Sequence, residues 1–414
     1  MTAEYRVGDV FDRLAEIPND SIDLIVTSPP FLALRSYLPD GHPDKAKEIG
    51  SEPTPAAFLD TLLDLTDEWG RILAPHGSLC VEMGDTYAGS GGAGGDYAEG
   101  GIRDGQGKFD GSGRRSRAAD VAAGILPATK RPGPDQRDRM PGWPLAKCKT
   151  MLDTLYPASL GYGRNLLTGR EIDPWRIRNR VVWARPNPPV GALGDKFRPA
   201  TSYITVACQG PRRWFDLDAV RTPLNPAGAP PLDWHADGHP EDGDWLWFLP
   251  TRGYKGAHHA VFPLALPKKL ILAMCPIRVC RTCGTPSERL TSKPTYEPSE
   301  HYRGGVMRNE ADRVAPMVNA WKGPDGSGQA SVVRHTTTTG WTTCGCDGTD
   351  GLKLDGHHTG TGWRPGIVLD PFTGSGTTLE AAQLCSRSSI GIDIDARNAD
   401  LARERVGMFL EVAS

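Results

Sequence analysis

Residues 370–378, Asp-Pro-Phe-Thr-Gly-Ser-Gly-Thr-Thr, constrain the fold of this chain more than any other segment. They follow the apolar run 367–369, which predicts a buried parallel strand, and they precede residues 379–384, which predict a helix. Glycines in such a loop let the backbone approach a ligand, and the start of the helix presents unpaired N–H groups. The segment therefore predicts an α/β sheet with a site for a nucleotide-like ligand at one edge.

A second acidic residue, Asp393, ends the next apolar run, 23 residues after Asp370. This spacing suits a carboxylate that binds ribose hydroxyls from the end of the second strand, although an isolated aspartate of this kind is more often part of a surface turn. The third glycine of the dinucleotide fingerprint is missing, because Leu379 stands in its place. An adenosine without phosphates therefore fits the loop better than a pyrophosphate cofactor.

Near the other end of the chain, an apolar run leads directly into residues 27–31, Thr-Ser-Pro-Pro-Phe. A loop that follows a strand in this way lies at the carboxyl edge of the sheet, where open α/β sheets bind ligands. Pro29 and Pro30 make the loop rigid and leave the Pro29 carbonyl free to accept a hydrogen bond from a substrate N–H. The Ser28 hydroxyl can accept a second, and Phe31 offers a flat face for stacking. The segment predicts a pocket for a nucleobase amine, and the alternative is a purely structural break after the strand.

Taken together, residues 27–31 and 370–378 resemble the DNA amino-methyltransferases that use S-adenosylmethionine (AdoMet). The order, with the tetrad at 28–31 first and the cofactor loop last, is similar to the beta group of that family. The resemblance implies a Rossmann-like AdoMet-dependent methyltransferase sheet, an α/β fold with helices on both faces. Further segments that agree with the family are residues 7–9, 22–24, 182–187 and 258–263. The resemblance covers roughly residues 5–87, 174–275 and 364–408.

The resemblance also implies roles for individual residues. Ser28 and the Pro29 carbonyl would hold the amino group of a base flipped out of the duplex, with Pro30 completing the tetrad and Phe31 stacking on the ring. Asp370 would lie near the methionine amine of the cofactor and Asp393 on its ribose, while Asp9 and Phe262 would contact its adenine. The cofactor-binding residues expected from the family are Asp9, Thr27, Phe262, Asp370, Phe372, Gly374, Gly376, Thr377 and Asp393.

The first residue of the tetrad bears on the target base. Within the family, Ser at this position is more typical of enzymes that methylate cytosine N4, whereas Asp or Asn accompanies adenine N6. We therefore expect site-specific methylation of cytosine N4 in double-stranded DNA, with adenine N6 as the alternative. No cysteine nucleophile stands beside Ser28, which argues against methylation of a ring carbon. Two further alternatives are an RNA methyltransferase and a catalytically silent, zinc-containing DNA-binding module.

The composition is that of a soluble protein, with a mean hydropathy of -0.40. No apolar stretch approaches the roughly 20 residues of a membrane helix, so we expect no membrane partner. The first residues contain no apolar secretory core, which predicts a cytoplasmic protein. At 414 residues the chain suits one large α/β domain with insertions, and a homodimer stays an open alternative to a monomer.

The net charge of -3 hides a local basic region. Residues 101–150 contain eleven Lys and Arg against five Asp, and five arginines between 164 and 180 extend the region. It predicts phosphate contacts with DNA, and the alternative is a solvated charged loop. The sequence divides into residues 1–87 (catalytic half), 88–150 (flexible Gly/Arg-rich insertion and candidate DNA contact), 151–274 (rest of the catalytic half and target recognition), 275–363 (cysteine-containing insertion) and 364–414 (AdoMet-binding part).

Four of the nine cysteines form two short pairs, Cys280 with Cys283 and Cys344 with Cys346. Two pairs held in tight turns are what a tetrahedral Zn²⁺ site of four thiolates requires. Such a site is structural, because four protein ligands leave no open position for a substrate. The pairs predict a small zinc-ribbon-like insertion, and the alternative is a set of reduced, unliganded thiols.

Overall fold

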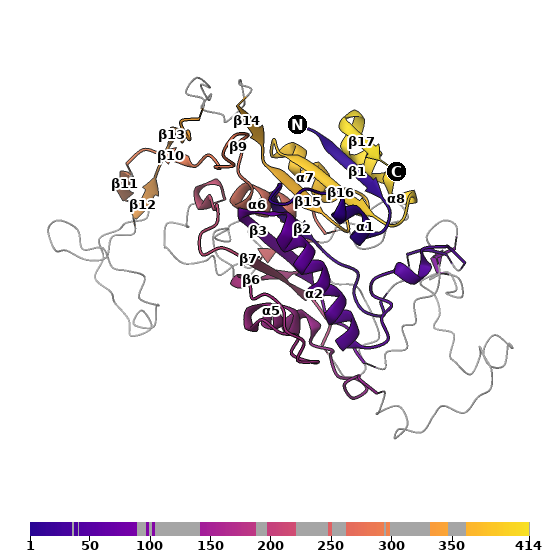
Figure 1. The fold of residues 1–414 in the computed structure, drawn as a ribbon. Helices are drawn as coiled ribbons and strands as arrows, with labels where there is room; N and C mark the ends of the chain where they lie inside the picture. The colour runs from indigo at the N-terminus through magenta and orange to yellow at the C-terminus, as the bar shows by residue number, and fades with distance from the viewer. Residues whose placement is uncertain are drawn as a thin grey trace, which may run out of the picture.

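Nine strands of the described chain pair into one sheet in the order β17-β1-β16-β15-β2-β3-β7-β6-β8 (Figure 1). Neighbouring strands are parallel, except that β7 is antiparallel to both β3 and β6. The computed structural model describes residues 1–34, 37–39, 41–88, 97–98, 102–103, 141–187, 197–220, 247–250, 262–293, 295–298, 332–346 and 362–413. The sheet strands are β1 (Ala3–Val7), β2 (Ile22–Thr27), β3 (Leu73–Met83), β6 (Arg176–Ala184), β7 (Thr201–Cys208), β8 (Trp247–Phe248), β15 (Ile367–Asp370), β16 (Ser388–Asp393) and β17 (Leu410–Ala413).

Helices cover both faces of this sheet, as predicted. Apolar side chains of α1, α2 and α5 join one buried cluster, and those of α6 and α7 join another on the opposite face. A third, smaller cluster packs α8 against β1 and the start of α7. The helices are α1 (Val10–Ala15), α2 (Pro55–Ile72), α5 (Leu152–Tyr162), α6 (Ala265–Met274), α7 (Thr377–Leu384) and α8 (Arg397–Val406), with short 3-10 turns η1 (Lys45–Lys47), η2 (Leu217–Ala219) and η4 (Gly407–Phe409).

Helix α2 illustrates how local sequence sets the boundaries of an element. Thr54 caps it, because its hydroxyl accepts a hydrogen bond from the Ala57 N–H at 3.2 Å, and Pro55 occupies the first turn. The helix ends at Ile72 because Leu73 adopts an extended backbone and begins β3. The apolar pattern of residues 77–83 predicts a strand there, and β3 is longer because it already begins at Leu73.

The neighbouring strands β15 and β2 form the point where the chain reverses direction across the sheet. From β15 the chain passes through α7 to β16 on one side, and from β2 it passes through α2 to β3 on the other. Because α7 and α2 cover opposite faces, a crevice opens at the carboxyl ends of β15 and β2. Residues 27–31 and 370–378 begin at this crevice, although they lie at opposite ends of the sequence.

The cysteine-containing insertion adds small two-stranded sheets at the amino ends of β2 and β15, away from the crevice (Figure 1). Asp23, buried near the start of β2, anchors it. Its carboxylate accepts two hydrogen bonds from Arg364, one from the Ile367 N–H at 2.7 Å and one from His76 Nε2 at 2.9 Å. The pairs are β9 (Arg278–Cys280) with β14 (Trp363–Pro365), β10 (Arg289–Thr291) with β13 (Thr338–Trp341), and β11 (Thr295–Pro298) with β12 (Val332–His335).

One local expectation is wrong, and another falls mostly outside the described residues. The adjacent aromatic residues Trp214 and Phe215 predict a short strand, but they form none; the Trp214 indole is instead buried and donates to the Ser287 carbonyl at 2.9 Å. Most of the predicted basic insertion, 88–150, lies outside the described residues. The described part of it is Ala88, the short pair β4 (Tyr97–Ala98) and β5 (Ile102–Arg103), and residues 141–150. Among the described helices, none is long and apolar enough to cross a membrane.

Candidate active site

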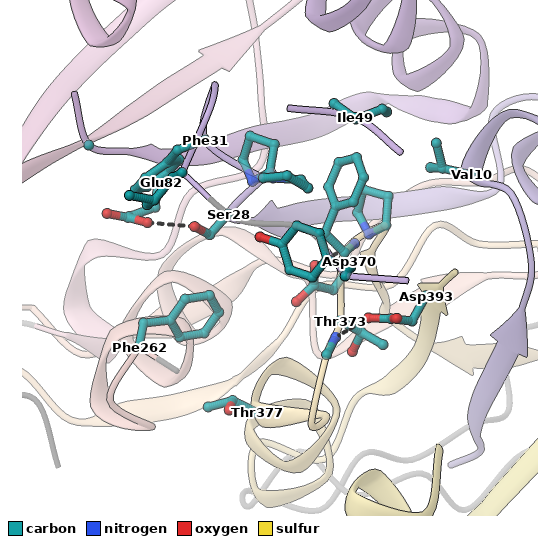
Figure 2. A pocket seen from close by; sticks show the side chains of 18 of the residues that line it. Val10, Ser28, Phe31, Ile49, Glu82, Phe262, Asp370, Thr373, Thr377 and Asp393 are labelled. Carbon is teal, nitrogen blue, oxygen red and sulfur yellow. Dashed lines mark hydrogen bonds between the residues drawn. The ribbon is translucent and has the colours of Figure 1, made fainter. Parts of the chain in front are cut away.

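A cavity of about 640 Å³ opens at the carboxyl edge of the central strands (Figure 2). Residues from both ends of the chain line it, including the loops after β1, β2, β15 and β16. The structure thus brings the predicted tetrad and the predicted cofactor loop together in one cavity. The sequence-predicted residues on its wall are Asp9, Ser28, Pro29, Pro30, Phe31, Phe262, Asp370, Phe372, Gly374, Thr377 and Asp393, whereas Thr27 and Gly376 lie behind it.

In the tetrad, the hydroxyl of Ser28 donates a hydrogen bond to the Glu82 carboxylate at 2.6 Å (Figure 2). This bond fixes the direction of the hydroxyl proton, so the lone pairs of Ser28 Oγ are left as acceptors. Among the described residues, no group donates to the Pro29 carbonyl. Two acceptors, one hydroxyl and one carbonyl, therefore stand side by side in the loop.

Glu82 is a site residue that the sequence did not indicate. It lies near the end of β3, which pairs with β2, and its side chain is buried against the cavity. Burial raises the pKa of its carboxyl group above the ordinary range, while the bond from Ser28 and the charge of Arg185 oppose that rise. A single acidic residue in an otherwise apolar strand was the only signal that could have marked it.

Aromatic rings form part of the cavity wall. The ring of Phe31 lies directly on the backbone at Gly84, where an added Cβ would come within 3.0 Å of Phe31 Cε2. Phe262, from the loop before α6, contributes a second ring and packs against the cluster beneath α6 and α7. A planar ligand can therefore find apolar faces next to the polar acceptors of the tetrad.

Asp370 joins the tetrad to the cofactor loop. One carboxylate oxygen accepts hydrogen bonds from the Thr27 hydroxyl at 2.8 Å and the Phe372 N–H at 3.1 Å, and the other accepts from the Thr378 hydroxyl at 2.5 Å. Burial raises the pKa of Asp370 to about 6 in spite of these donors. Thr27 therefore acts behind the wall, holding the carboxylate that shapes the loop.

Asp393 is held in a similar way at the end of β16. Its carboxylate accepts from the N–H groups of Gly374 at 2.9 Å and Asp395 at 2.8 Å, and from the Asn398 side chain at 3.1 Å. Burial raises the pKa of Asp393 to about 6. The hydroxyl of Thr373 lies beside it (Figure 2), buried and without a hydrogen-bond partner among the described residues.

The remaining predicted residues have identifiable places. Asp9 caps α1 by accepting from the Phe11 and Asp12 N–H groups at 3.1 and 3.3 Å, and it still lines the cavity. Gly376 adopts φ of +79° at the start of α7, where a Cβ would come within 3.0 Å of the Ala402 Cβ on α8. Gly376 thus serves helix packing and the turn into α7.

The profile of a family described as DNA methylase matches residues 22–278 and 364–404 of this chain. The matched segments contain the tetrad, Glu82 and the loop from Asp370 to Asp393. The chain belongs to the N6/N4 DNA methylase family. It is therefore a DNA methyltransferase, and the predicted family is confirmed. The interval between the matched segments, 279–363, coincides with most of the predicted cysteine insertion.

Individual relatives of this methylase are distant. Type II methyltransferase M.SmaI from Serratia marcescens is 24% identical, over 97% of this chain and 89% of the relative. Type II methyltransferase M.Cfr9I from Citrobacter freundii is 26% identical, over 64% of this chain and 70% of the relative. Similar solved structures include the cytosine-N4-specific PvuII DNA methyltransferase, 13% identical with a TM-score of 0.48, covering 98% of this chain and 86% of that one. Another is a putative DNA modification methylase from Thermus thermophilus complexed with S-adenosyl-L-methionine, 18% identical with a TM-score of 0.41, covering 100% and 98%.

The methylase carries a second group of reactive side chains, at the opposite edge of the sheet from the cavity. The sulfur atoms of Cys280, Cys283, Cys344 and Cys346 all lie within 4.8 Å of one another. The two predicted pairs, which are far apart in sequence, thus form one cluster. Cys275 is buried and takes no part in it.

Proposed function

We propose that this methylase transfers a methyl group from AdoMet to N4 of a cytosine flipped out of double-stranded DNA. The observation that carries the proposal is the bond from Ser28 to Glu82 in a cavity shared with the cofactor loop. That bond makes Ser28 an acceptor, and the Pro29 carbonyl is a second. Two acceptors suit the two N–H bonds of an exocyclic amine.

The cofactor half of the cavity fits AdoMet. A buried hydroxyl without a partner in the described chain, that of Thr373, and the carboxylate of Asp393 offer polar groups for a ribose, while Phe262 offers a face for adenine. Asp9 and the backbone near Phe372 complete this half, and Gly374 and Thr377 would line the methionine portion. Asp370 supports the loop that would hold the methionine portion. AdoMet supplies a methyl group on a positively charged sulfonium, and the neighbouring carboxylates favour a positive charge.

The protein's own part in the reaction is to orient the amine and to remove one proton. Hydrogen bonds to Ser28 and Pro29 turn the lone pair of the amine out of conjugation with the ring and aim it toward the methyl donor. Once nitrogen has gained a carbon substituent, it must lose a proton. Ser28 accepts that proton while passing its own to Glu82, and the raised pKa of Glu82 suits it to receive a proton.

Ser at the first tetrad position supports cytosine over adenine as the target. The relatives named type II methyltransferases support a role in modifying a specific DNA sequence within a restriction-modification system. The runner-up is methylation of adenine N6, since the family includes both amines.

Methylation of duplex DNA with labelled AdoMet, followed by digestion to nucleosides, tests this proposal. We expect label in N4-methylcytosine, and we expect Ser28→Ala to lower the rate about 100-fold or more, because the amine loses an acceptor and the route to Glu82. The control is Ser21→Ala, whose hydroxyl donates to the Pro18 carbonyl at 2.6 Å, away from the cavity. Label only in N6-methyladenine would contradict cytosine as the target base. Label in RNA but not in duplex DNA would contradict duplex DNA as the substrate.

We also propose that the four-cysteine cluster holds one structural Zn²⁺. Bonds of about 2.3 Å from a tetrahedral zinc place its sulfur ligands about 3.8 Å apart, which the cluster can reach with small shifts. Metal analysis should give one equivalent of zinc. Cys346→Ser should lose it and lower the unfolding midpoint by about 5 °C or more. The exposed Cys148, far from the cluster in sequence, provides the control Cys148→Ser. Less than half an equivalent of zinc in protein never exposed to chelator would contradict the site.

A further inference from the structure

Two oppositely charged side chains, Glu82 and Arg185, line the same cavity without touching. No ion pair within 4 Å and no hydrogen bond joins them in the described part of the chain. Instead, Arg185 donates from Nη2 to the Thr201 carbonyl at 3.0 Å, and its Nε is buried without a partner among the described residues. Burial lowers the pKa of its guanidinium, and the charge of Glu82 opposes that shift. Arg185 therefore retains hydrogen-bonding capacity that the described residues do not use.

The fold explains why these two groups line the same cavity. Strand β7 pairs with β3 through Ile204, opposite Glu82, and with β6 through Thr201, opposite Ala184. Arg185 directly follows Ala184, so its side chain projects from the same carboxyl edge as the tetrad. Glu82, on β3, contacts Ser28 on one side of the cavity. Arg185 lines the same cavity from the end of β6, two strands away from β3 in the sheet.

The chemistry of a flipped cytosine matches this separation of charge. Its pairing edge presents the N4 amine as a donor, followed by N3 and O2 as acceptors. Ser28 and the Pro29 carbonyl would accept hydrogen bonds from the N4 amine, with Glu82 bonded to Ser28. A buried acceptor that receives no hydrogen bond destabilises the bound base, so the pocket needs donors for N3 and O2. A guanidinium offers two parallel N–H groups, which suit two adjacent acceptors.

We propose that Arg185 reads the target base by donating to N3 and O2 of the cytosine whose amine Ser28 holds. Adenine offers an amine and a single acceptor, N1, at the same edge, and a C–H stands where the second acceptor would be. Arg185 thus makes the pocket select cytosine. This inference rests on the proposed function and adds the residue that determines the specificity for the base.

The test compares two target bases in one enzyme. Duplexes carry the recognition sequence, found by sequencing modified DNA from cells that express the protein, with cytosine or adenine at the target position. The target faces an abasic site in both, so that the two bases are equally easy to flip. Wild type, Arg185→Gln and Arg185→Lys are compared by kcat/KM on each duplex and by AdoMet affinity. The control is Arg403→Gln, an exposed residue of α8 that pairs with Asp400.

For Arg185→Gln we expect kcat/KM on cytosine to fall about 10–150-fold, the loss of a charge-assisted hydrogen bond, with a much smaller change on adenine. Arg185→Lys keeps the positive charge but not the two parallel N–H groups, so its kcat/KM on cytosine should lie between those of wild type and Arg185→Gln. Arg403→Gln should have the kcat/KM of wild type on both duplexes. AdoMet affinity should stay unchanged in all of them. If Arg185→Gln loses AdoMet affinity because it misfolds, the comparison of cytosine and adenine rests on Arg185→Lys alone.

An equal loss on both bases would overturn the inference, because it would mean that Arg185 only supports the Thr201 backbone. No loss on either base would overturn it too. Both of these results leave cytosine methylation by the wild type intact. Wild type that modifies adenine and not cytosine would instead refute the proposed function, and the inference with it.

Discussion

Replacing Glu82 with Gln is expected to lower the turnover number about 10²–10⁴-fold and to leave AdoMet affinity nearly unchanged. The amide keeps the shape of the carboxyl group and can still accept the bond from Ser28. It cannot take up the proton that the amine must release. The measurement is single-turnover methylation of duplex DNA, with Glu68→Gln, a partly exposed residue of α2 paired with Arg71, as the control.

The pH dependence separates this role from a structural one. Only the ionised form of Glu82 accepts a proton, so the wild-type rate should rise with pH through the raised pKa of this group. In Glu82→Gln that rise should vanish. A raised carboxyl pKa favours the protonated form in the folded protein, so it costs stability as pH rises above the unfolded value. The variant should therefore be at least as stable as wild type at neutral pH. Wild-type turnover in Glu82→Gln would exclude Glu82 as the proton acceptor.

Replacing Asp370 with Ala is expected to weaken AdoMet binding about 100-fold or more and to destabilise the protein. The change leaves the hydroxyls of Thr27 and Thr378 and the N–H of Phe372 buried without an acceptor, and each such loss costs about 1–3 kcal/mol of stability. It also removes a buried carboxylate whose pKa is raised from 3.8 to about 6, which gains about 3 kcal/mol at neutral pH. The three donors left without an acceptor cost about 3–9 kcal/mol together, which is at least as large as that gain, so we expect a net loss of stability.

Calorimetry of AdoMet binding and denaturant unfolding measure the two effects of this change. Asp370→Asn should lie between Ala and wild type, because an amide still offers one acceptor oxygen. Asp400→Ala, on the exposed side of α8, is the matched control, with no expected change in either measurement. Full AdoMet affinity in Asp370→Ala would show that the cofactor loop does not depend on this carboxylate.

Residues 27–31 and 370–378 were predictable because each follows an apolar parallel strand, and the carboxyl ends of such strands share one edge. Glu82 could not be predicted as a site residue, because one acidic residue in a strand ordinarily faces solvent. Only the pairing of β3 with β2 brings Glu82 to Ser28. Arg185 stood in a segment that matched the family, but its place in the cavity depends on β7 inserting between β3 and β6.

Other local features depended on tertiary contacts in the same way. Helix α5 was not predicted because Pro157 lies within it, and its stability comes from packing on α2, where the Tyr156 hydroxyl meets the Thr66 hydroxyl at 2.7 Å. The cysteine pairs were predictable as a cluster from ligand chemistry alone. Their location at the far edge of the sheet required the pairing of β9 with β14.

The position of β1 bears on how the protein is made. Its neighbours in the sheet are β16 and β17, the last two strands of the described chain. Strand β1 therefore gains its partners in the sheet only after the long segment between Val7 and Ser388 has been synthesised. The bond from Thr27 to Asp370, 343 residues apart, likewise forms only after the intervening chain has been synthesised. A product terminated before residue 367 would lack both, together with the loop at residues 370–378 that lines the cavity.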